Sequence, residues 1–454
     1  MSGMPFFQAL LLLASVVVLT VATGSRRLHP FLALAVVASA FGLGVGFTTG
    51  FLGKAFGAGF SQAIYSPGLV IVAAGFVAGL AESTAASGWL IAIIDRGRWL
   101  GATRLAAFLG LIAGIAASPV AAFALLTPLL RAIVGPTAPK REAAMIAPAL
   151  AISASHGLVL FSPVLIAAAA IVDASWGRVA LFGLPVAVLL VAFGAAWARW
   201  LPVVGPAAPA SIEQPPVILD QRSRWPAIVL LAATAIPLLM LTVQSLGDIP
   251  SEPLGGGTAR EMILGFGRPL ILFLVAAGIM FIGLWRLSAK LLADSGWTGR
   301  VLGNVSGVLL TVGAAGGLQR LCQETGMAEL LGENLLGWHV AGSAALLVPF
   351  VIAALIKTLQ GSSLVAAITT AGMVRPILAP LGIGDDNGRA LATLAIGAGA
   401  MTVSHVNDEY FWLVSASAGL APLRRLAAMT AGTLLQGLIA VAALIVLSVL
   451  IASV

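Results

Sequence analysis

The chain of 454 residues is 60% hydrophobic and 9% charged, whereas soluble domains carry about 25% charged residues. A mean hydropathy of +1.06 excludes an ordinary soluble domain and predicts an integral membrane protein. The net charge of +7 comes from short Lys and Arg clusters between apolar runs, so we expect membrane lipid as the surroundings and no nucleic-acid partner. A single cysteine, Cys322, excludes an intrachain disulfide and a cysteine-based metal site.

Apolar runs recur from one end of the chain to the other. Because about 20 apolar residues cross a bilayer, we place spans near 4–23, 28–48, 67–94, 102–130, 144–172, 178–201, 225–246, 268–287, 301–318, 338–356, 358–383, 389–418 and 426–452. Several are too long or too interrupted for one straight helix, which indicates about 12 to 14 helical segments with broken helices or re-entrant hairpins. The runs lack the alternation of membrane strands, so the predicted fold is an all-α polytopic membrane protein.

A proline-rich connector divides the chain. Residues 201–224 combine clustered prolines with most of the local polarity, which predicts an exposed linker between membrane repeats at 1–200 and 225–454. Three pairs of similar segments occur in the same order in both halves: GLAESTAASGW with GLQRLCQETGM, SPVAAFALLTP with SSLVAAITTAG, and ISASHG with MTVSHV. Chance similarity among small-residue helices is the alternative. Two inverted repeats around a linker are typical of secondary transporters.

Two ionisable residues of the first half lie within apolar runs. Glu82 occurs in LAESTAASG, and His156 occurs in SASHGLVLFSP. A charge at membrane depth costs at least about 2.5 kcal/mol, so such residues usually face a cavity or a partner. We therefore expect Glu82 to serve as a proton relay and His156 to contact a solute. A histidine satisfied between two helices is the alternative for His156.

In the second half, Lys357 lies in IKTLQGSSLVAA with 17 uncharged residues on each side. A lysine that extends toward the membrane surface is the alternative interpretation. Gly361 and Ser362 follow closely, and a helix break at a glycine exposes backbone N–H groups that favour an anion. Lys357, Gly361 and Ser362 are therefore candidate residues for binding a carboxylate.

The segment SHVNDEYFW at 404–412 holds the densest polarity of any apolar run. If it is helical, His405, Asp408 and Glu409 stand at i, i+3 and i+4 and share one face, with Ser404 one turn before Asp408. This cluster could bind hydroxyl groups and carry a proton. The alternative is a solvated loop between two shorter helices.

Motifs for enzyme chemistry are missing. The sequence contains no nucleophile triad, no GxxxxGK[ST] phosphate loop and no His/Cys metal spacing. We therefore expect no enzyme, no cofactor and no bound metal. Transport would then depend on an ion gradient or on the gradient of the solute itself.

These motifs resemble those of a known family. SHVNDEYFW is similar to the Ser-His-Val-Asn-Asp-Ser-Gly-Phe-Trp signature of the gluconate permease family, the gluconate:H+ symporters of the wider ion-transporter superfamily. IKTLQGSSLVAAITTAG resembles the family's segment of a basic residue, Gly-Ser, Val-Ala and threonines. The resemblance covers nearly the whole chain. It implies an inverted-repeat carrier in the bacterial inner membrane that couples protons to gluconate, glycerate, fructuronate, D-serine or related polar acids.

The resemblance also implies site residues. The matching positions are Lys357, Gly361, Ser362, Ser404, His405, Asn407, Asp408 and the pair His156-Gly157. The match fails at Leu160 and Phe161, where the family has paired prolines. It fails again at Glu409 and Tyr410, where the family has Ser-Gly. These departures add a bulky ring and a negative charge to the expected pocket.

The sequence thus predicts proton-coupled uptake of a small polar organic acid anion, such as a gluconate-like sugar acid or hydroxycarboxylate. Lys357 and the N–H groups near Gly361 would hold the carboxylate. The remaining substrate contacts would come from Ser362, Ser404, His405, Asn407 and His156, and the proton-coupling groups would be Asp408, Glu409 and Glu82. A Na+/H+ exchanger that uses the membrane carboxylates is the alternative, and whether the chain forms a homo-oligomer stays open.

Overall fold

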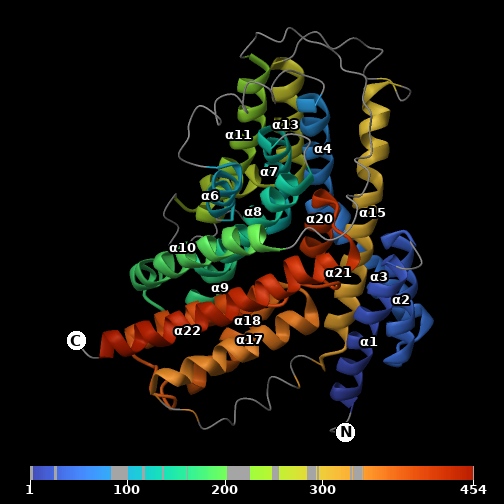
Figure 1. Ribbon diagram of the computed structural model, residues 1–454. Helices are drawn as coiled ribbons and strands as arrows, with labels where there is room; N and C mark the ends of the chain where they lie inside the picture. Colours follow the sequence, from blue (N-terminus) through green and yellow to red (C-terminus); the bar gives the residue numbers. More distant parts are fainter. Residues whose placement is uncertain are drawn as a thin grey trace.

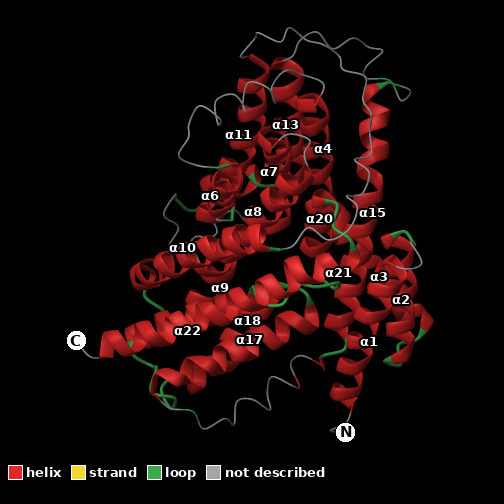
Figure 2. Ribbon diagram, viewed as in Figure 1, coloured by secondary structure: helices red, strands yellow, loops and turns green. Residues whose placement is uncertain are grey.

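The computed structural model describes residues 4–24, 28–82, 101–114, 118–134, 138–160, 162–201, 225–247, 255–283, 293, 296–327, 330, 340 and 342–452. Within these ranges the chain is helical and contains no strand (Figure 2). The predicted all-α polytopic membrane fold is therefore confirmed.

The first half contains nine α-helices and one π-helical turn within the described ranges. They are α1 (Met4–Gly24), α2 (Pro30–Gly44), α3 (Thr49–Ala63), η1 (Ile64–Gly68), α4 (Leu69–Glu82), α6 (Ala102–Ala113), α7 (Pro119–Val134), α8 (Ala138–Leu158), α9 (Pro163–Val172) and α10 (Trp176–Trp200). Proline begins α2, α7 and α9, where its missing N–H would have no intrahelical partner and its fixed φ suits a first turn.

The second half continues with α11 (Trp225–Gly247), α12 (Gly257–Phe266), α13 (Pro269–Gly283), α15 (Trp297–Glu324), η2 (Gly342–Leu346), α17 (Leu347–Gln360), α18 (Ser363–Val374), η3 (Arg375–Ile377), α19 (Asp386–Ala400), α20 (Glu409–Ala418), α21 (Pro422–Arg425), η4 (Leu426–Ala431) and α22 (Gly432–Ala452). Three of the predicted long spans, 102–130, 144–172 and 389–418, are each divided between two helices. The expected linker at 201–224 lies outside the described residues from 202 onward.

Seven of the described helical stretches are long and apolar enough to cross a membrane. The first of them, 6–23, is only 22% buried inside the protein, whereas the stretch 142–172 that contains α8 and α9 is 71% buried. Large apolar side chains such as Leu13, Leu181 and Val446 are more than half exposed. The exposed helices thus present apolar side chains outward, as lipid requires, and α8–α9 lies at the centre.

Two groups of helices are visible in Figure 1. The helices α4, α7, α11 and α13 pack together in the upper part, and below them α10 packs on α22 and α17 packs on α18. α15 runs along both groups and contacts α2, α3, α4, α17 and α20. The N-terminal helix α1 packs on α2 and α21.

The broken spans α8–α9 and α19–α20 run antiparallel through the lower group. Asp173, directly after α9, contacts Arg389 in the first turn of α19, with 3.0 Å between Oδ2 and Nη1. At the other end, Glu142 of α8 contacts Arg424 of α21. Between these ends the two backbones touch, because a Cβ added to Gly397 would lie 1.9 Å from the carbonyl oxygen of Gly157. Helices from the two halves of the sequence therefore pack directly against each other.

Candidate functional site

Four helices begin at breaks between helices, and a short polar side chain caps each of them. In each case a side-chain oxygen accepts a hydrogen bond from a backbone N–H in the first turn of the helix. The capping residues are Ser118 (3.3 Å from Ala121 N), Ser162 (3.3 Å from Leu165 N), Ser362 (3.3 Å from Val365 N) and Asp408 (2.9 Å from Tyr410 N). Serine and aspartate favour this position because they satisfy N–H groups that a helix start leaves unpaired.

A buried ion pair joins two of these breaks. Lys357 lies in the last turn of α17, and its Nζ is 2.7 Å from Oδ2 of Asp408. The two side chains are only 4% and 10% exposed. Lys357 Nζ also donates to the Gly361 carbonyl at 2.6 Å, and the Ser404 hydroxyl donates to Oδ2 of Asp408 at 2.7 Å. Both charged groups thus have further hydrogen-bond partners besides each other, as buried charges require.

Gly361 brings the two breaks into contact. Its φ of +77° is left-handed, and a Cβ added there would lie 2.2 Å from the carbonyl oxygen of Asn407. No side chain larger than hydrogen fits this position without moving the opposite backbone. The sequence prediction of a helix break at Gly361 is therefore confirmed, and its neighbour is the break that holds Asp408.

His405 and Asn407 cover the carboxyl end of α17. The ring Nε2 of His405 lies 2.6 Å from the Thr358 carbonyl oxygen, and Asn407 Nδ2 donates to the carbonyls of Thr358 at 3.0 Å and Leu359 at 3.2 Å. The last carbonyls of a helix have no intrahelical donor, so these side chains supply one. On their other sides, His405 Nδ1 and Asn407 Oδ1 are buried and form no hydrogen bond within the described structure.

The prediction that His405, Asp408 and Glu409 share one helical face is wrong. Residues 401–408 are not helical, and α20 begins only at Glu409. The reason is local competition for the backbone, because Asp408 caps α20 and the Thr433 hydroxyl accepts from Ser404 N at 3.0 Å. Glu409 also lies on a different side, since a Cβ on Gly316 of α15 would be 2.8 Å from its Oε1.

His156 brings the first half of the chain to the same region. It is 6% exposed at the end of α8, it interacts with the backbone of Gly114, and its Nδ1 has no hydrogen-bond partner within the described structure. The charge of Lys357 acts electrostatically on His156, His405 and Glu409. Candidate residues of both halves therefore lie in the same region as this buried cation.

Glu82 is not placed at this site. It ends α4, and its side chain lies outside the described residues.

Two threonines that were not predicted from the sequence contact the site. The Thr430 hydroxyl donates to the Ser404 carbonyl at 2.7 Å, and the Thr433 hydroxyl accepts from the Ser404 N–H. Their only sequence signal is an i, i+3 pair of hydroxyls at the start of a long apolar run.

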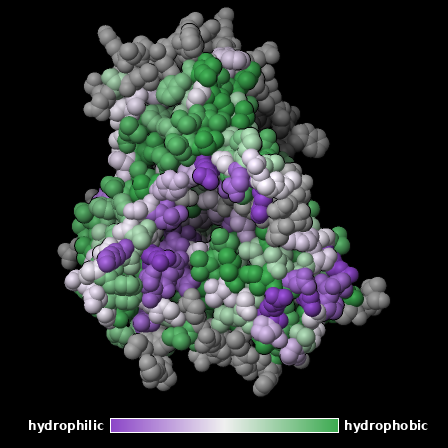
Figure 3. All heavy atoms as spheres, turned by 180° about the vertical axis from the view of Figure 1, so that it is seen from behind, coloured by the Kyte–Doolittle hydropathy of each residue, from purple (hydrophilic) through white to green (hydrophobic). Residues whose placement is uncertain are grey.

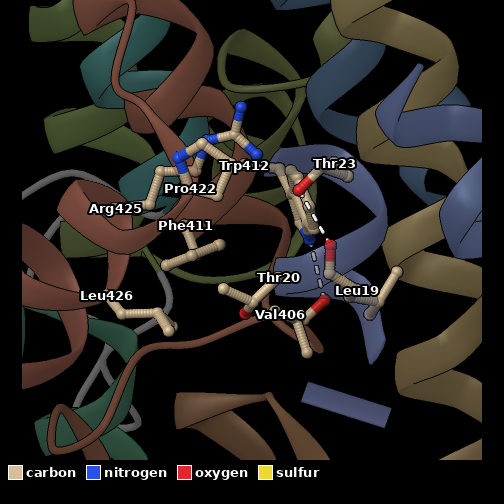
Figure 4. A pocket seen from close by; sticks show the side chains of 9 residues that line it. All are labelled: Leu19, Thr20, Thr23, Val406, Phe411, Trp412, Pro422, Arg425 and Leu426. Carbon is tan, nitrogen blue, oxygen red and sulfur yellow. Dashed lines mark hydrogen bonds between the residues drawn. The ribbon is translucent and has the colours of Figure 1, made fainter. Parts of the chain in front are cut away.

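A small pocket lies next to the break at residues 401–408, between α1, α20 and α21 (Figure 4). It is lined by Leu19, Thr20, Thr23, Val406, Phe411, Trp412, Pro422, Arg425 and Leu426. The Trp412 indole donates to the Val406 carbonyl at 2.8 Å, and the Arg425 guanidinium lies 5.4 Å from the centre of the Trp412 ring. These contacts hold the 401–408 break in place on the side that faces α1. Figure 3, seen from behind, shows a hollow bordered by hydrophilic side chains.

The described residues offer no metal centre, because they contain no group of three or more His, Cys, Asp or Glu side chains that could hold an ion. The arrangement instead combines one buried cation, one buried carboxylate and several polar atoms without partners. Such a set suits reversible binding of a small polar solute.

Comparison with known proteins identifies the family. The model of the GntP family permeases matches residues 7–451. The chain belongs to the GntP family of permeases. It is 29% identical to a gluconate permease of Pseudomonas aeruginosa over 91% of this chain and 92% of that protein. It is also 25% identical to the D-serine transporter DsdX of Escherichia coli, over 97% of this chain and 98% of that one.

A third relative is the Gnt-II system L-idonate transporter of Escherichia coli. It is 26% identical to this chain over 67% of this chain and 67% of that one. The resemblance stated from the sequence motifs is therefore confirmed. The chain is a multi-pass membrane transporter for small organic acids and not an enzyme.

Proposed function

We propose that this GntP permease takes up a small polar organic acid anion together with protons across the inner, cytoplasmic membrane. The observation that carries the proposal is the buried Lys357–Asp408 pair, which lies beside unpartnered nitrogen and oxygen atoms of His405 and Asn407. Unpartnered polar atoms are costly when buried. A hydroxylated solute would satisfy them, and its carboxylate would find a cation at the same place.

Competition for Lys357 explains how proton and anion movement would be coupled. With Asp408 ionised, the ammonium group is already neutralised at 2.7 Å. If a proton neutralises Asp408, Lys357 is left without its counter-ion and can accept the carboxylate of the substrate. Anion binding would therefore be favourable only after protonation, which couples one event to the other.

The other candidate residues complete the proposed site. Gly361 lets the two breaks meet, and Ser362, Ser404, His405, Asn407 and His156 are the candidate contacts for hydroxyl or amino groups of the solute. Asp408 or Glu409 would take the proton, and Glu82 is a candidate relay. The relatives are named for gluconate, L-idonate and D-serine, which all combine a carboxylate with further polar groups.

We also propose that residues 1–200 and 225–454 are inverted repeats. Two observations support this. His156 interacts with the backbone at the end of α6, as His405 does with the end of α17. α6 packs on α8, as α17 packs on α19. Antiparallel broken spans are the arrangement that inverted repeats produce around a central solute site.

The Asp408→Asn variant tests the coupling. In membrane vesicles with an imposed proton gradient, we expect it to lose accumulation of the acid while it retains counterflow exchange, because its side chain is permanently neutral. Glu261→Gln, an exposed acid of α12, serves as the control. Full gradient-driven accumulation by Asp408→Asn would refute the proton role.

Lys357→Ala tests the anion site. We expect its affinity for the acid to fall severalfold or more in a binding titration of purified protein, with sugar acids, hydroxy acids and amino acids as the panel. Unchanged affinity would place the anion elsewhere. Sodium-dependent pH changes in vesicles without any organic acid would instead support a Na+/H+ exchanger.

A further inference from the structure

Ion pairs join the two antiparallel broken spans at both of their ends. At one end, Asp173 pairs with Arg389 at 3.0 Å, and Arg178 at the start of α10 pairs with Asp386 at 3.3 Å. At the opposite end, Glu142 pairs with Arg424 at 2.6 Å. All three pairs join the first half of the chain to the second.

The two ends differ in their exposure to solvent. The side chains of Arg389 and Asp173 are 37% and 79% exposed, and those of Arg178 and Asp386 are 40% and 69% exposed. Water and salt screen such pairs, so they contribute little to holding the spans together. The ion pairs at this end can therefore break with little loss of interaction energy.

The Glu142–Arg424 end is held far more firmly. Its two side chains are only 10% and 16% exposed, and the Nε and Nη2 atoms of Arg424 both lie 2.6 Å from Oε2 of Glu142. Arg424 also donates to the carbonyl of Leu201, at the end of α10. Separating these groups would leave uncompensated charge in a buried place, which is strongly unfavourable.

Between the two ends lies a point of direct backbone contact. A Cβ on Gly397 would be 1.9 Å from the carbonyl oxygen of Gly157, and a Cβ on Gly183 of α10 would be 2.1 Å from that of Leu158. No side chain separates the helices at these two crossing points. The contact also lies next to His156, which belongs to the candidate site.

We propose that the Asp173–Arg389 and Arg178–Asp386 end is a gate through which solute reaches the buried site from one side of the membrane. The α9–α10 segment tilts away from α19 about the Gly157–Gly397 contact, while the Glu142–Arg424 end stays closed. The proposal requires that the chain is a permease. It does not depend on proton coupling or on the anion site at Lys357.

Hydrogen–deuterium exchange of the wild-type protein in detergent tests the gate without any substrate. Raising the ionic strength from about 0.05 M to about 0.5 M shortens the screening length severalfold. We expect exchange of peptides covering 173–179 and 384–389 to accelerate, and exchange of peptides covering 142–146 and 420–425 to stay unchanged. An equal response at both ends, or no response at the first, would overturn the proposal.

Cross-linking tests whether the movement is needed for uptake. In a Cys322→Ser background, a short reducible cross-linker would join Asp173→Cys to Arg389→Cys in one variant and Glu142→Cys to Arg424→Cys in another. We expect the first cross-link to remove most of the uptake and reduction to restore it, whereas the second leaves uptake unchanged. Persistent uptake after the first cross-link, or equal inhibition by both, would contradict the gate.

These results are separable from a failure of the proposed function. If the Cys322→Ser parent protein, which keeps every ion pair, takes up no organic acid, the assignment of substrate and proton coupling is at fault. The exchange experiment then decides the gate by itself, because it measures the opening of the two ends directly.

Discussion

Lys357 and Asp408 neutralise each other at a depth where neither charge is tolerated alone. The sequence showed that each residue lies in an apolar run, and it predicted the glycine break beside Lys357. It did not predict the pair, because the two residues are 51 positions apart and each was assigned a different partner. Contacts between breaks in different helices leave no local pattern in a single sequence.

Removal of one partner should therefore destabilise the protein more than removal of both. We expect Lys357→Met to lower the free energy of unfolding by about 3–5 kcal/mol, since it leaves an unpaired buried carboxylate. The double variant Lys357→Met/Asp408→Asn should recover most of the melting temperature without recovering uptake. Thermal unfolding in detergent measures this, with Lys54→Met, at an exposed position of α3, as the control. Equal melting temperatures for the single and double variants would contradict the pairing.

Gly361 offers a second test at a single residue. Gly361→Ala combines a left-handed φ of +77° with a Cβ 2.2 Å from the Asn407 oxygen. The conformation alone costs on the order of 1 kcal/mol for alanine, and the backbone of the opposite break must move as well. We expect uptake to be lost in vesicles. Gly372→Ala, at a position of α18 with open space around the added atom, should retain uptake.

At the scale of helices, the positions of spans were predictable and the internal breaks only partly so. Apolar runs located the spans, and Gly361-Ser362 and Ser162-Pro163 carry the glycine or proline that marks a helix boundary. The break at 401–408 contains neither residue. It forms because the backbone N–H of Ser404 donates to the Thr433 hydroxyl, while the side chains of Asn407 and Asp408 bond to backbone groups of α17 and of the first turn of α20. Those bonds depend on tertiary contacts that the sequence alone does not show.

The contact between α8 and α19 should tolerate no added side chain. We expect Gly397→Val to force these helices apart, because even a Cβ would lie 1.9 Å from the Gly157 oxygen. Overpacking of this kind typically costs about 1–3 kcal/mol, which would lower the melting temperature and uptake together. Gly303→Val in α15, where nothing lies within 4 Å of the added Cβ, is the matched control. A Gly397→Val protein as stable as this control would contradict the close crossing.

For the whole molecule, contacts between the halves hold the helices around the site together. α8 packs on α19 and α20, α10 packs on α19 and α22, and Gln436 of α22 donates to the carbonyls of Leu150 and Leu190. Each half therefore leaves buried polar groups unsatisfied without the other. The sequence predicted two halves and a linker, but their interlocking is a property of the folded structure.

A chain divided within 202–224 should still assemble. We expect the two fragments to restore uptake when they are expressed together and to copurify, because no described contact of the site depends on that segment. Each fragment alone should aggregate or be degraded. A single fragment that is monodisperse in detergent would show that the halves are independent bodies.

The distance along the chain between Lys357 and Asp408 also has a consequence for biogenesis. Synthesis runs from the amino terminus, so the lysine leaves the ribosome 51 residues ahead of its carboxylate partner. During that interval the α17–α18 hairpin carries an unneutralised ammonium group, which opposes transfer from the translocon into lipid by roughly 2.5–3.5 kcal/mol. We therefore expect the hairpin to reach its final depth only once the α19–α20 segment has been translated, so that the lysine and its carboxylate enter the bilayer together.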